Sequence, residues 1–158
     1  MGTTTLKKIA SFQVNHEKLT PGIYVSRIDG DVVTYDVRMK TPNAGDYLPN
    51  AAMHTFEHLF ATFARSSEFE KDVIYVGPMG CRTGFYFLLR DSVTKEQTIT
   101  LLQDCFAFIA SFEGDIPGVS RVECGNYLEH DLEGAKKIAR DMIPVVADWT
   151  PEKMVYTL

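Results

Sequence analysis

The stretch NAAMHTFEHLFATFARSS (50–67) constrains the chain most, because it has the apolar spacing of a buried helix and ionisable side chains in its middle. Asn50 is the expected N-cap of this helix. His54 and His58 are four residues apart and therefore project from the same face, and Glu57 lies on nearly the same side. The apolar residues recur about one turn apart and predict the buried face: Met53, Phe56, Phe60 and Phe63.

The order of these side chains, H-x-x-E-H, is the inverse of the zinc signature H-E-x-x-H. In that signature two histidines bind the metal, and the glutamate handles protons at metal-bound water or substrate. The alternative interpretation is an exposed polar stripe. The flanking segments AAM and LFATFA favour a buried helix, however, and a buried cluster of imidazoles and carboxylate costs several kcal/mol unless a partner satisfies it. We therefore expect a divalent cation here.

A catalytic metal site typically has three protein ligands and one position open for water or substrate, so a third ligand is expected elsewhere. Cys124 in VECGNY is the best candidate, because a glycine-containing loop can direct a thiolate at an ion. His16 and His130 are alternatives, but neither has a paired spacing. Cys105 lies at helical spacing among apolar residues in LLQDCFAFIA and is expected to be a packing residue.

The loop GPMGCRTG (77–84) holds another candidate thiol, Cys81, between two predicted strands. Its glycines let a substrate approach the backbone closely, and Arg82 would favour a thiolate. The simpler interpretation is a tight loop that happens to contain a cysteine. Beside a metal site, however, the Cys81 thiol and the Glu57 carboxylate suit enolisation, because the metal polarises a carbonyl while these two groups move protons.

The composition limits the partners of the chain. Its 158 residues suffice for one domain with a substantial core, and we expect a single domain over 1–158. A formal charge of −5 argues against nucleic acid as a partner. No apolar run is long enough to predict a membrane span, and MGTTTLKKIASF lacks the apolar core of a signal peptide. Three cysteines, an odd number, argue against a disulfide framework, so we expect a cytoplasmic protein.

The order of β-rich and helical patterns predicts an α+β fold. GIYVSRIDGDVVTYDVRM (22–39) contains two β-rich runs around Asp29-Gly30, which suits a hairpin with a type I′ turn. Thr94 and Gln97 are spaced for a capping box at the start of a helix. We expect a mainly antiparallel sheet packed against helices as a two-layer sandwich. The remaining predicted elements are two strands and two helices, over 72–77, 84–90, 94–112 and 131–143.

A series of segments resembles one enzyme family in order and spacing, over nearly the whole chain. The segments are SFQVNH (11–16), YDVRMKTPN (35–43), HTFEHLFA (54–61), FARSS (63–67), GPMGCRTGFY (77–86), ECG (123–125) and HDLEGAK (130–136). The family is S-ribosylhomocysteine lyase, which produces the autoinducer-2 precursor used in quorum sensing. The resemblance implies a metal-dependent lyase.

The resemblance implies a metal centre and a catalytic pair at particular positions. His54, His58 and Cys124 match the family's metal ligands, which hold one divalent metal per subunit. Iron(II) is the expected native metal, and zinc(II) or cobalt(II) can replace it. Glu57 and Cys81 match the catalytic pair.

The resemblance also implies a homodimer with its active sites at the subunit interface. Ser11 and His16 are then expected to serve the site of a neighbouring chain. Many family members have an acidic residue three positions before PMGC, where this chain has Tyr75, so another group or water would contact the amino end of the homocysteine moiety. The positions that match substrate-binding residues are Ser11, His16, Arg38 and Arg65.

The implied reaction cleaves S-ribosylhomocysteine to homocysteine and 4,5-dihydroxy-2,3-pentanedione by two carbonyl migrations and β-elimination of the thiol. The residues alone also allow two other functions. An inverzincin-type metallopeptidase would use Glu57 to activate water, but such peptidases are much longer and give the Cys81 loop no role. A non-catalytic metal-stabilised protein would usually close its site with four protein ligands.

Overall fold

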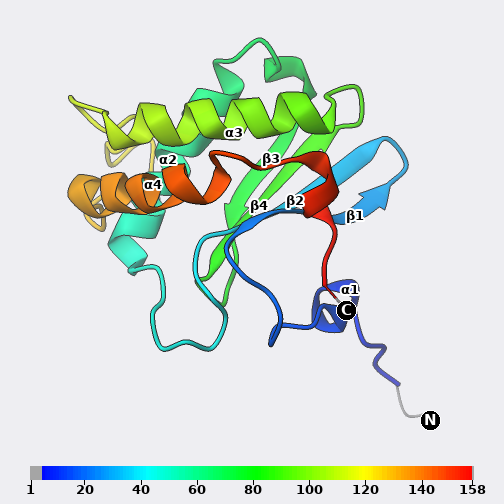
Figure 1. Cartoon of the computed structure of the whole chain (residues 1–158). Helices are drawn as coiled ribbons and strands as arrows, with labels where there is room; N and C mark the ends of the chain where they lie inside the picture. Colours follow the sequence, from blue (N-terminus) through cyan, green and yellow to red (C-terminus); the bar gives the residue numbers. More distant parts are fainter. Residues whose placement is uncertain (1–4, 158) are drawn as a thin grey trace.

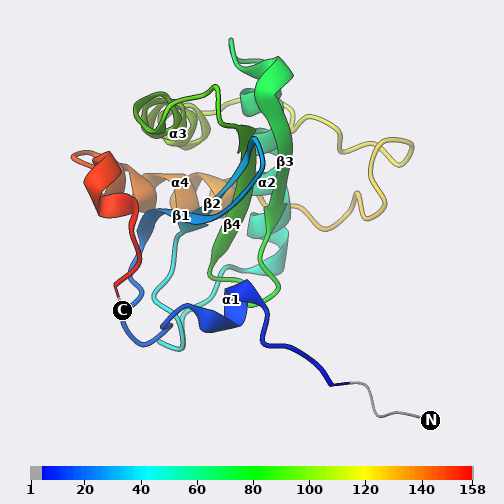
Figure 2. The same cartoon turned by 90° about the vertical axis from the view of Figure 1, so that its right-hand side faces the viewer.

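The computed structural model describes residues 5–157 and shows one sheet with helices packed on one of its faces (Figure 1 and Figure 2). Residues 1–4, which begin the segment that lacks a signal-peptide core, and residue 158 lie outside the described range. Among the helices of the described range, none has the length and apolar character needed to cross a membrane.

Four strands of the described chain form the sheet in the order β1-β2-β4-β3, and all neighbouring pairs are antiparallel. The strands are β1 (Gly22–Asp29), β2 (Val32–Arg38), β3 (Val73–Pro78) and β4 (Gly84–Arg90). The predicted antiparallel sheet is therefore confirmed. Because Arg38 pairs with Gly84, the end of β2 lies beside the loop that carries Cys81.

The turn between β1 and β2 differs from the predicted one. Asp29 pairs with Val32, so the loop residues are Gly30 and Asp31 rather than Asp29 and Gly30. Gly30 has a φ of 59°, and Asp31 does not have a positive φ. A type I′ turn needs a positive φ at both loop residues, so the predicted turn type was wrong, although the hairpin is confirmed.

The helices include three long ones in the described chain, and two of them start where the sequence predicts. The long helices are α2 (Asn50–Arg65), α3 (Lys95–Ala110) and α4 (Leu132–Val146). Thr94 and Gln97 form the predicted capping box of α3, and Asp131 accepts a hydrogen bond from Gly134 N–H at the start of α4. The short helices are α1 (Ala10–Gln13), η1 (Glu70–Asp72) and η2 (Pro151–Met154).

The start of α2 does not use the predicted cap. Pro49, rather than Asn50, is the N-cap, with a φ of −62° and a ψ of 140°, and no side chain caps the helix. The carbonyl oxygen of Pro49 accepts from Met53 N–H, so the helix begins one residue earlier than predicted. Proline fits this position because its φ is fixed near the observed value and it has no N–H to leave unpaired.

The core lies between the sheet and the helical layer. Phe56 on α2 packs on Phe85 with ring centroids 5.2 Å apart, and Phe60 packs on Phe87 at 5.0 Å. Cys105 on α3 lies in the same core and is 1% exposed, which confirms its predicted packing role. The α+β two-layer prediction is confirmed. Alternate residues of β2 and β4 supply the sheet side of the core: Val33, Tyr35, Val37, Phe85, Phe87 and Leu89.

In the described part of the chain, the opposite face of the sheet carries polar side chains and is not covered by α2, α3 or α4. Asp36 and Arg38 alternate with the core residues of β2 and therefore point to this face. The C-terminal segment also reaches it, because the Tyr156 hydroxyl donates to Asp36. The two faces of the sheet therefore differ, because the helical face is apolar and buried in the core, whereas this open face carries an ion pair.

Candidate functional site

The predicted metal ligands meet between α2 and the loop over residues 111–131. His54 and His58 project from α2, and Cys124 lies in the loop. Cys124 Sγ is 3.4 Å from His54 Nε2 and 3.9 Å from His58 Nε2. Two histidines one helical turn apart and a sulfur about 70 residues later therefore converge on one point.

Backbone carbonyl groups fix the tautomers of both histidines. His54 Nδ1 lies 2.7 Å from the carbonyl oxygen of Glu129, and His58 Nδ1 lies 2.8 Å from that of Pro117. A carbonyl oxygen only accepts hydrogen bonds, so each Nδ1 carries the proton. In a neutral imidazole the Nε2 lone pair is then free, and on both rings Nε2 faces Cys124 Sγ.

Two glycines allow the surrounding segments to approach α2 closely. Gly118 has a φ of 72°, and a Cβ at this position would lie 3.3 Å from His58 Nδ1. Glycine therefore lets Pro117 place its carbonyl oxygen against the His58 ring. Gly134 packs on α2, where a Cβ would come within 2.6 Å of Ala52 Cβ. Larger residues at either position would push the segments that build the cluster away from α2.

The donor set fits a divalent cation. Imidazole nitrogens and thiolates bind zinc, iron and cobalt. In a tetrahedral site with metal–nitrogen distances of about 2.0–2.1 Å and a metal–sulfur distance of about 2.3 Å, nitrogen and sulfur are roughly 3.6 Å apart. The Nε2–Sγ distances of 3.4 and 3.9 Å lie on either side of this value.

His130 joins the cluster as a fourth group. The possible ligand atoms of the four side chains all lie within 4.8 Å of one another. The His130 ring stacks on that of His54, with centroids 3.9 Å apart, and its Nε2 is 3.9 Å from Cys124 Sγ. Burial, followed by the neighbouring His54 and His58, lowers the pKa of His130, which favours its neutral form.

Glu57 lines an open cavity beside these ligands. The cavity has a volume of about 640 Å³, and its other lining residues include His58, Thr62, Tyr75 and Glu123. Glu57 is partly buried, so its carboxylate is accessible from a space large enough for a sugar-sized substrate. Its role in proton transfer stays a prediction.

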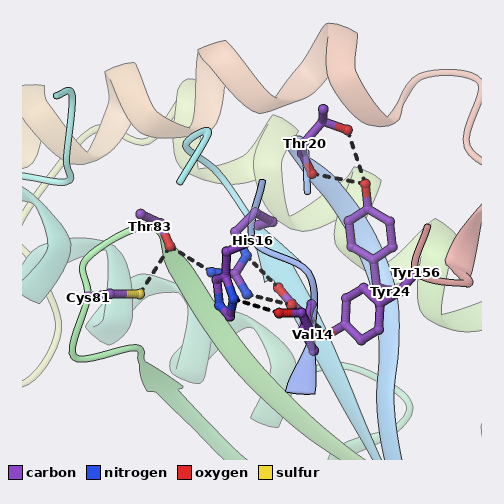
Figure 3. Close-up of polar contacts among 9 residues, drawn as sticks. Val14, His16, Thr20, Tyr24, Cys81, Thr83 and Tyr156 are labelled. Atoms are coloured by element: carbon purple, nitrogen blue, oxygen red, sulfur yellow. Dashed lines mark hydrogen bonds and ion pairs between the residues drawn. The ribbon is translucent and has the colours of Figure 1, made fainter. Parts of the chain in front are cut away.

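Cys81 lies in a different cavity, with a volume of about 310 Å³. Cys81 Sγ is 3.1 Å from Thr83 Oγ1, and His16 Nδ1 is 2.9 Å from the carbonyl oxygen of Val14 (Figure 3). Within one chain, Cys81 is therefore grouped with predicted substrate-binding residues, whereas Glu57 lies with the metal ligands. The substrate-binding candidates in the Cys81 cavity are Ser11, His16 and Arg38.

A buried ion pair holds Arg38 in the Cys81 cavity. Its Nη2 donates to Asp36 Oδ2 at 2.7 Å, and its Nη1 donates to Thr83 Oγ1 at 2.7 Å. Burial alone lowers the pKa of Arg38, but the charge and hydrogen bonds of Asp36, and then the charge of Cys81, raise it above its ordinary value. Because Thr83 contacts both Arg38 and Cys81, a permanent cation lies close to the thiol.

Arg82, the cation expected beside Cys81, contacts a different segment. Its Nη1 donates to the carbonyl oxygen of Leu48 at 3.2 Å, and its guanidinium lies 5.9 Å from the centroid of the Tyr47 ring. The Arg82 backbone is left-handed, with a φ of 59°, which costs about 1–3 kcal/mol and persists where surrounding contacts enforce it. Arg82 thus shapes the loop, and Arg38, which shares Thr83 with Cys81, is the cation beside the thiol.

Tyr156 completes the Arg38 network from the C-terminal segment. Its hydroxyl donates to Asp36 Oδ2 at 2.7 Å, and its ring stacks on Tyr24 with centroids 5.2 Å apart (Figure 3). Burial, followed by the charge of Asp36, raises the pKa of Tyr156, so the hydroxyl stays protonated as a donor. Asp36 is 1% exposed and therefore depends on protein donors to satisfy its charge.

Replacing Tyr156 with phenylalanine is expected to lower the free energy of unfolding by about 1.5–3 kcal/mol, because a buried carboxylate loses a hydrogen bond. Urea unfolding at a fixed protein concentration measures this loss. The matched control is Tyr127→Phe, since the Tyr127 hydroxyl makes no hydrogen bond within residues 5–157. It should change stability by less than about 0.5 kcal/mol. Equal losses in the two variants would contradict the role given to Tyr156.

Arg65 and Tyr75 lie at the edge of the sheet. The Arg65 guanidinium donates to the carbonyl oxygens of Val73 and Ile74, at 3.4 and 3.3 Å. Tyr75 is 55% exposed and lines both the Glu57 cavity and a cavity on the open face of the sheet. Tyr75 therefore stands between the two groups of candidate residues. Substrate binding by Arg65 stays a prediction.

The sequence pattern missed several polar groups that shape the site. His130 was set aside for its isolated spacing, yet it lies in the cluster. Thr55 is fully buried and contacts His130 Nδ1, although its place between His54 and Phe56 gives no signal of that contact. Asp36 had a usable signal, because residues i and i+2 of a strand share a face and Arg38 follows it at that spacing.

The chain is similar to known proteins over nearly its whole length. A family model described as S-ribosylhomocysteinase (LuxS) matches residues 9–153. The S-ribosylhomocysteine lyase of Clostridium beijerinckii is 45% identical over 157 residues, covering 96% of this chain and 99% of the relative. The S-ribosylhomocysteine lyase of Desulfotalea psychrophila is 46% identical over 153 residues, covering 94% and 96%. That of Finegoldia magna is 44% identical over 155 residues, covering 96% and 99%.

Proposed function

The chain belongs to the S-ribosylhomocysteinase family, and we propose that it is a lyase that cleaves S-ribosylhomocysteine to homocysteine and 4,5-dihydroxy-2,3-pentanedione, the autoinducer-2 precursor. The observation that carries this proposal is the convergence of His54, His58 and Cys124 beside the Glu57 cavity. We propose these three side chains as ligands of one divalent metal per subunit, iron(II) in the cell, with zinc(II) or cobalt(II) as substitutes.

The metal supplies Lewis acidity. When bound, the cation polarises the sugar carbonyl and makes the neighbouring C–H groups acidic enough to be deprotonated near neutral pH. This matters because a thioether is hard to cleave by direct hydrolysis. Moving the carbonyl to C3 makes the C4 proton acidic and places the sulfur on C5 in the β position.

Cys81 and Glu57 carry the protons in this scheme. Cys81, as a thiolate, removes the C2 proton and returns it to C1, which moves the carbonyl from C1 to C2. A second transfer, from C3 to C2, moves the carbonyl to C3. Glu57 then removes the C4 proton, the electron pair forms the C4–C5 double bond, and the C5–S bond breaks to release homocysteine thiolate. The remaining enol takes a proton at C5 to give the diketone.

The substrate contacts follow from the Cys81 cavity. Ser11, His16 and Arg38 line it with the thiol, and we propose that they orient the sugar hydroxyl groups. Arg38 is already bound to Asp36 and Thr83, so its position is fixed before substrate enters. Arg65 is proposed as a further contact at the edge of β3.

We propose that each active site combines two subunits of a homodimer. Cys81 and Glu57 line separate cavities in one chain, although the reaction needs both at one sugar. The Cys81 cavity opens at the sheet face that lacks a layer of long helices, where Ile9 and Phe12 are 55% and 66% exposed. We propose that the two-fold contact also includes the sheet edge at Tyr75, which lines the Glu57 cavity as well, and that it brings the Cys81 cavity of one subunit against the Glu57 cavity of its partner.

Thiol release tests the proposed function directly. The protein is purified without oxygen, its metal content is measured, and free thiol is followed after S-ribosylhomocysteine is added. We expect one homocysteine per substrate and loss of the reaction after chelation. A peptide-hydrolysis assay on the same sample tests the metallopeptidase alternative. Absence of thiol release from metal-loaded protein would contradict the proposal. A reducing cytoplasm, the proposed location, would keep Cys81 and Cys124 as thiols.

A further inference from the structure

We propose that His130 donates a hydrogen bond from Nε2–H to the Cys124 sulfur and is not a fourth metal ligand. The inference rests on the proposed function, because a lyase centre needs a coordination position that the protein leaves open. The cluster of His54, His58, Cys124 and His130 alone would equally suit a closed structural site with four protein ligands. The hydrogen-bond partners of the rings decide between the two arrangements.

Thr55 fixes the proton on the His130 ring. Thr55 Oγ1 accepts from Asp131 N–H at 2.9 Å and lies 2.9 Å from His130 Nδ1. Its side chain is fully buried, so the hydroxyl proton needs an acceptor within the protein. Within residues 5–157, the hydrogen bonds of the Thr55 hydroxyl offer only one such acceptor, His130 Nδ1. The hydroxyl therefore donates to Nδ1, and the neutral ring carries its proton on Nε2.

The three histidines thus differ in what they present to the centre of the cluster. His54 and His58 meet carbonyl oxygens at Nδ1 and present lone pairs at Nε2. His130 meets a hydroxyl donor at Nδ1 and presents an N–H at Nε2, 3.9 Å from Cys124 Sγ. A protonated nitrogen cannot bind a metal, whereas it can donate to a thiolate.

The hydrogen bond to sulfur would tune the centre. It withdraws charge from the Cys124 thiolate, so the metal keeps more of its positive charge for the substrate carbonyl. The same contacts hold the segment after the loop, because Thr55 on α2 accepts from Asp131, which also caps α4. His130 is therefore a positioning residue that acts through Cys124.

Nuclear magnetic resonance of the zinc(II)-loaded wild-type protein tests the tautomers without any substitution. Nitrogen-15 shifts of the imidazoles separate protonated, unprotonated and metal-bound nitrogens. We expect Nδ1–H with metal-bound Nε2 for His54 and His58, and Nε2–H with unprotonated Nδ1 for His130. A metal-bound Nε2 or a protonated Nδ1 on His130 would overturn the proposal.

Cobalt(II)-loaded variants test the hydrogen bond to sulfur. His130→Leu removes the donor, whereas His130→Gln keeps an N–H near the Nε2 position. At saturating cobalt, we expect the sulfur-to-cobalt charge-transfer band to move to lower energy in His130→Leu and to stay near the wild-type position in His130→Gln. The ligand-field bands should keep their intensity in both variants. A large change in the ligand-field bands, or a charge-transfer band that stays unmoved in His130→Leu, would contradict the proposal.

The affinity for cobalt(II) gives a second, quantitative measurement of the same effect. Loss of a group that hydrogen-bonds a ligand typically weakens metal binding by about 10–100-fold, and we expect His130→Leu to fall in this range for cobalt(II). These readouts do not depend on turnover. Wild-type protein that shows the expected tautomers but releases no thiol would refute the lyase function and leave the His130 assignment standing. Normal thiol release with a metal-bound His130 would refute the His130 assignment and leave the lyase function standing.

Discussion

Replacing Cys81 with alanine is expected to lower kcat for thiol release by about 10²–10⁴-fold, the usual contribution of a general acid–base group. Metal content should stay at the wild-type value. The metal content should not change because Cys81 lies in a separate cavity, with Arg38 and in contact with Thr83, and is not part of the metal-binding cluster. Steady-state kinetics with S-ribosylhomocysteine and elemental analysis of the same preparation measure both quantities.

Cys105→Ala is the matched control for the loss of a thiol. Cys105 lies in the core, where burial raises the pKa of its thiol, so it can neither bind metal nor transfer protons near neutral pH. Its replacement should leave kcat unchanged and lower stability by about 1 kcal/mol. Wild-type turnover by metal-loaded Cys81→Ala protein would remove this thiol from the mechanism.

Replacing His58 with alanine is expected to remove the metal and, with it, turnover. The substitution takes away one of three proposed ligands and leaves the Pro117 carbonyl oxygen without its imidazole partner. Loss of a group that only orients a ligand weakens metal binding by about 10–100-fold, so loss of a ligand itself should weaken it by more than about 100-fold. Competition with a chelating dye measures the affinity for zinc(II).

His16→Ala serves as the control for this experiment. His16 lines the Cys81 cavity and bonds the Val14 carbonyl oxygen, so its loss should affect substrate binding and leave one metal per chain. Full metal content in His58→Ala would show that the cluster binds the ion without this imidazole. The ligand position proposed for His58 would then have to be assigned to His130.

The local sequence patterns predicted the elements that carry the chemistry. The helix with the H-x-x-E-H motif, the capping box at Thr94 and the start of α4 at Asp131 all follow short-range rules of hydrogen bonding and periodicity. Cys105 was identified as a core residue because its neighbours are apolar at helical spacing. These features depend on residues close in the sequence, which is why a single chain reveals them.

Contacts between segments that are distant in the sequence could not be predicted from these local patterns. The separation of Cys81 from Glu57 depends on how β4 pairs in the sheet, which no local pattern specifies. The Thr55–His130 contact joins residues 75 apart in the sequence. The predicted turn type of the hairpin was wrong because the strand register places the loop one residue later, at Gly30 and Asp31.

Activity of mixed dimers tests most directly whether each active site combines the Glu57 cavity of one subunit with the Cys81 cavity of the other. Cys81→Ala and Glu57→Gln chains with different affinity tags are co-expressed, and dimers that carry both tags are isolated. Each mixed dimer would then contain one intact site and one site with both substitutions, so we expect about half of wild-type activity, although each variant alone is nearly inactive. Mixed dimers as inactive as either parent, or failure to obtain dimers at all, would contradict the shared site.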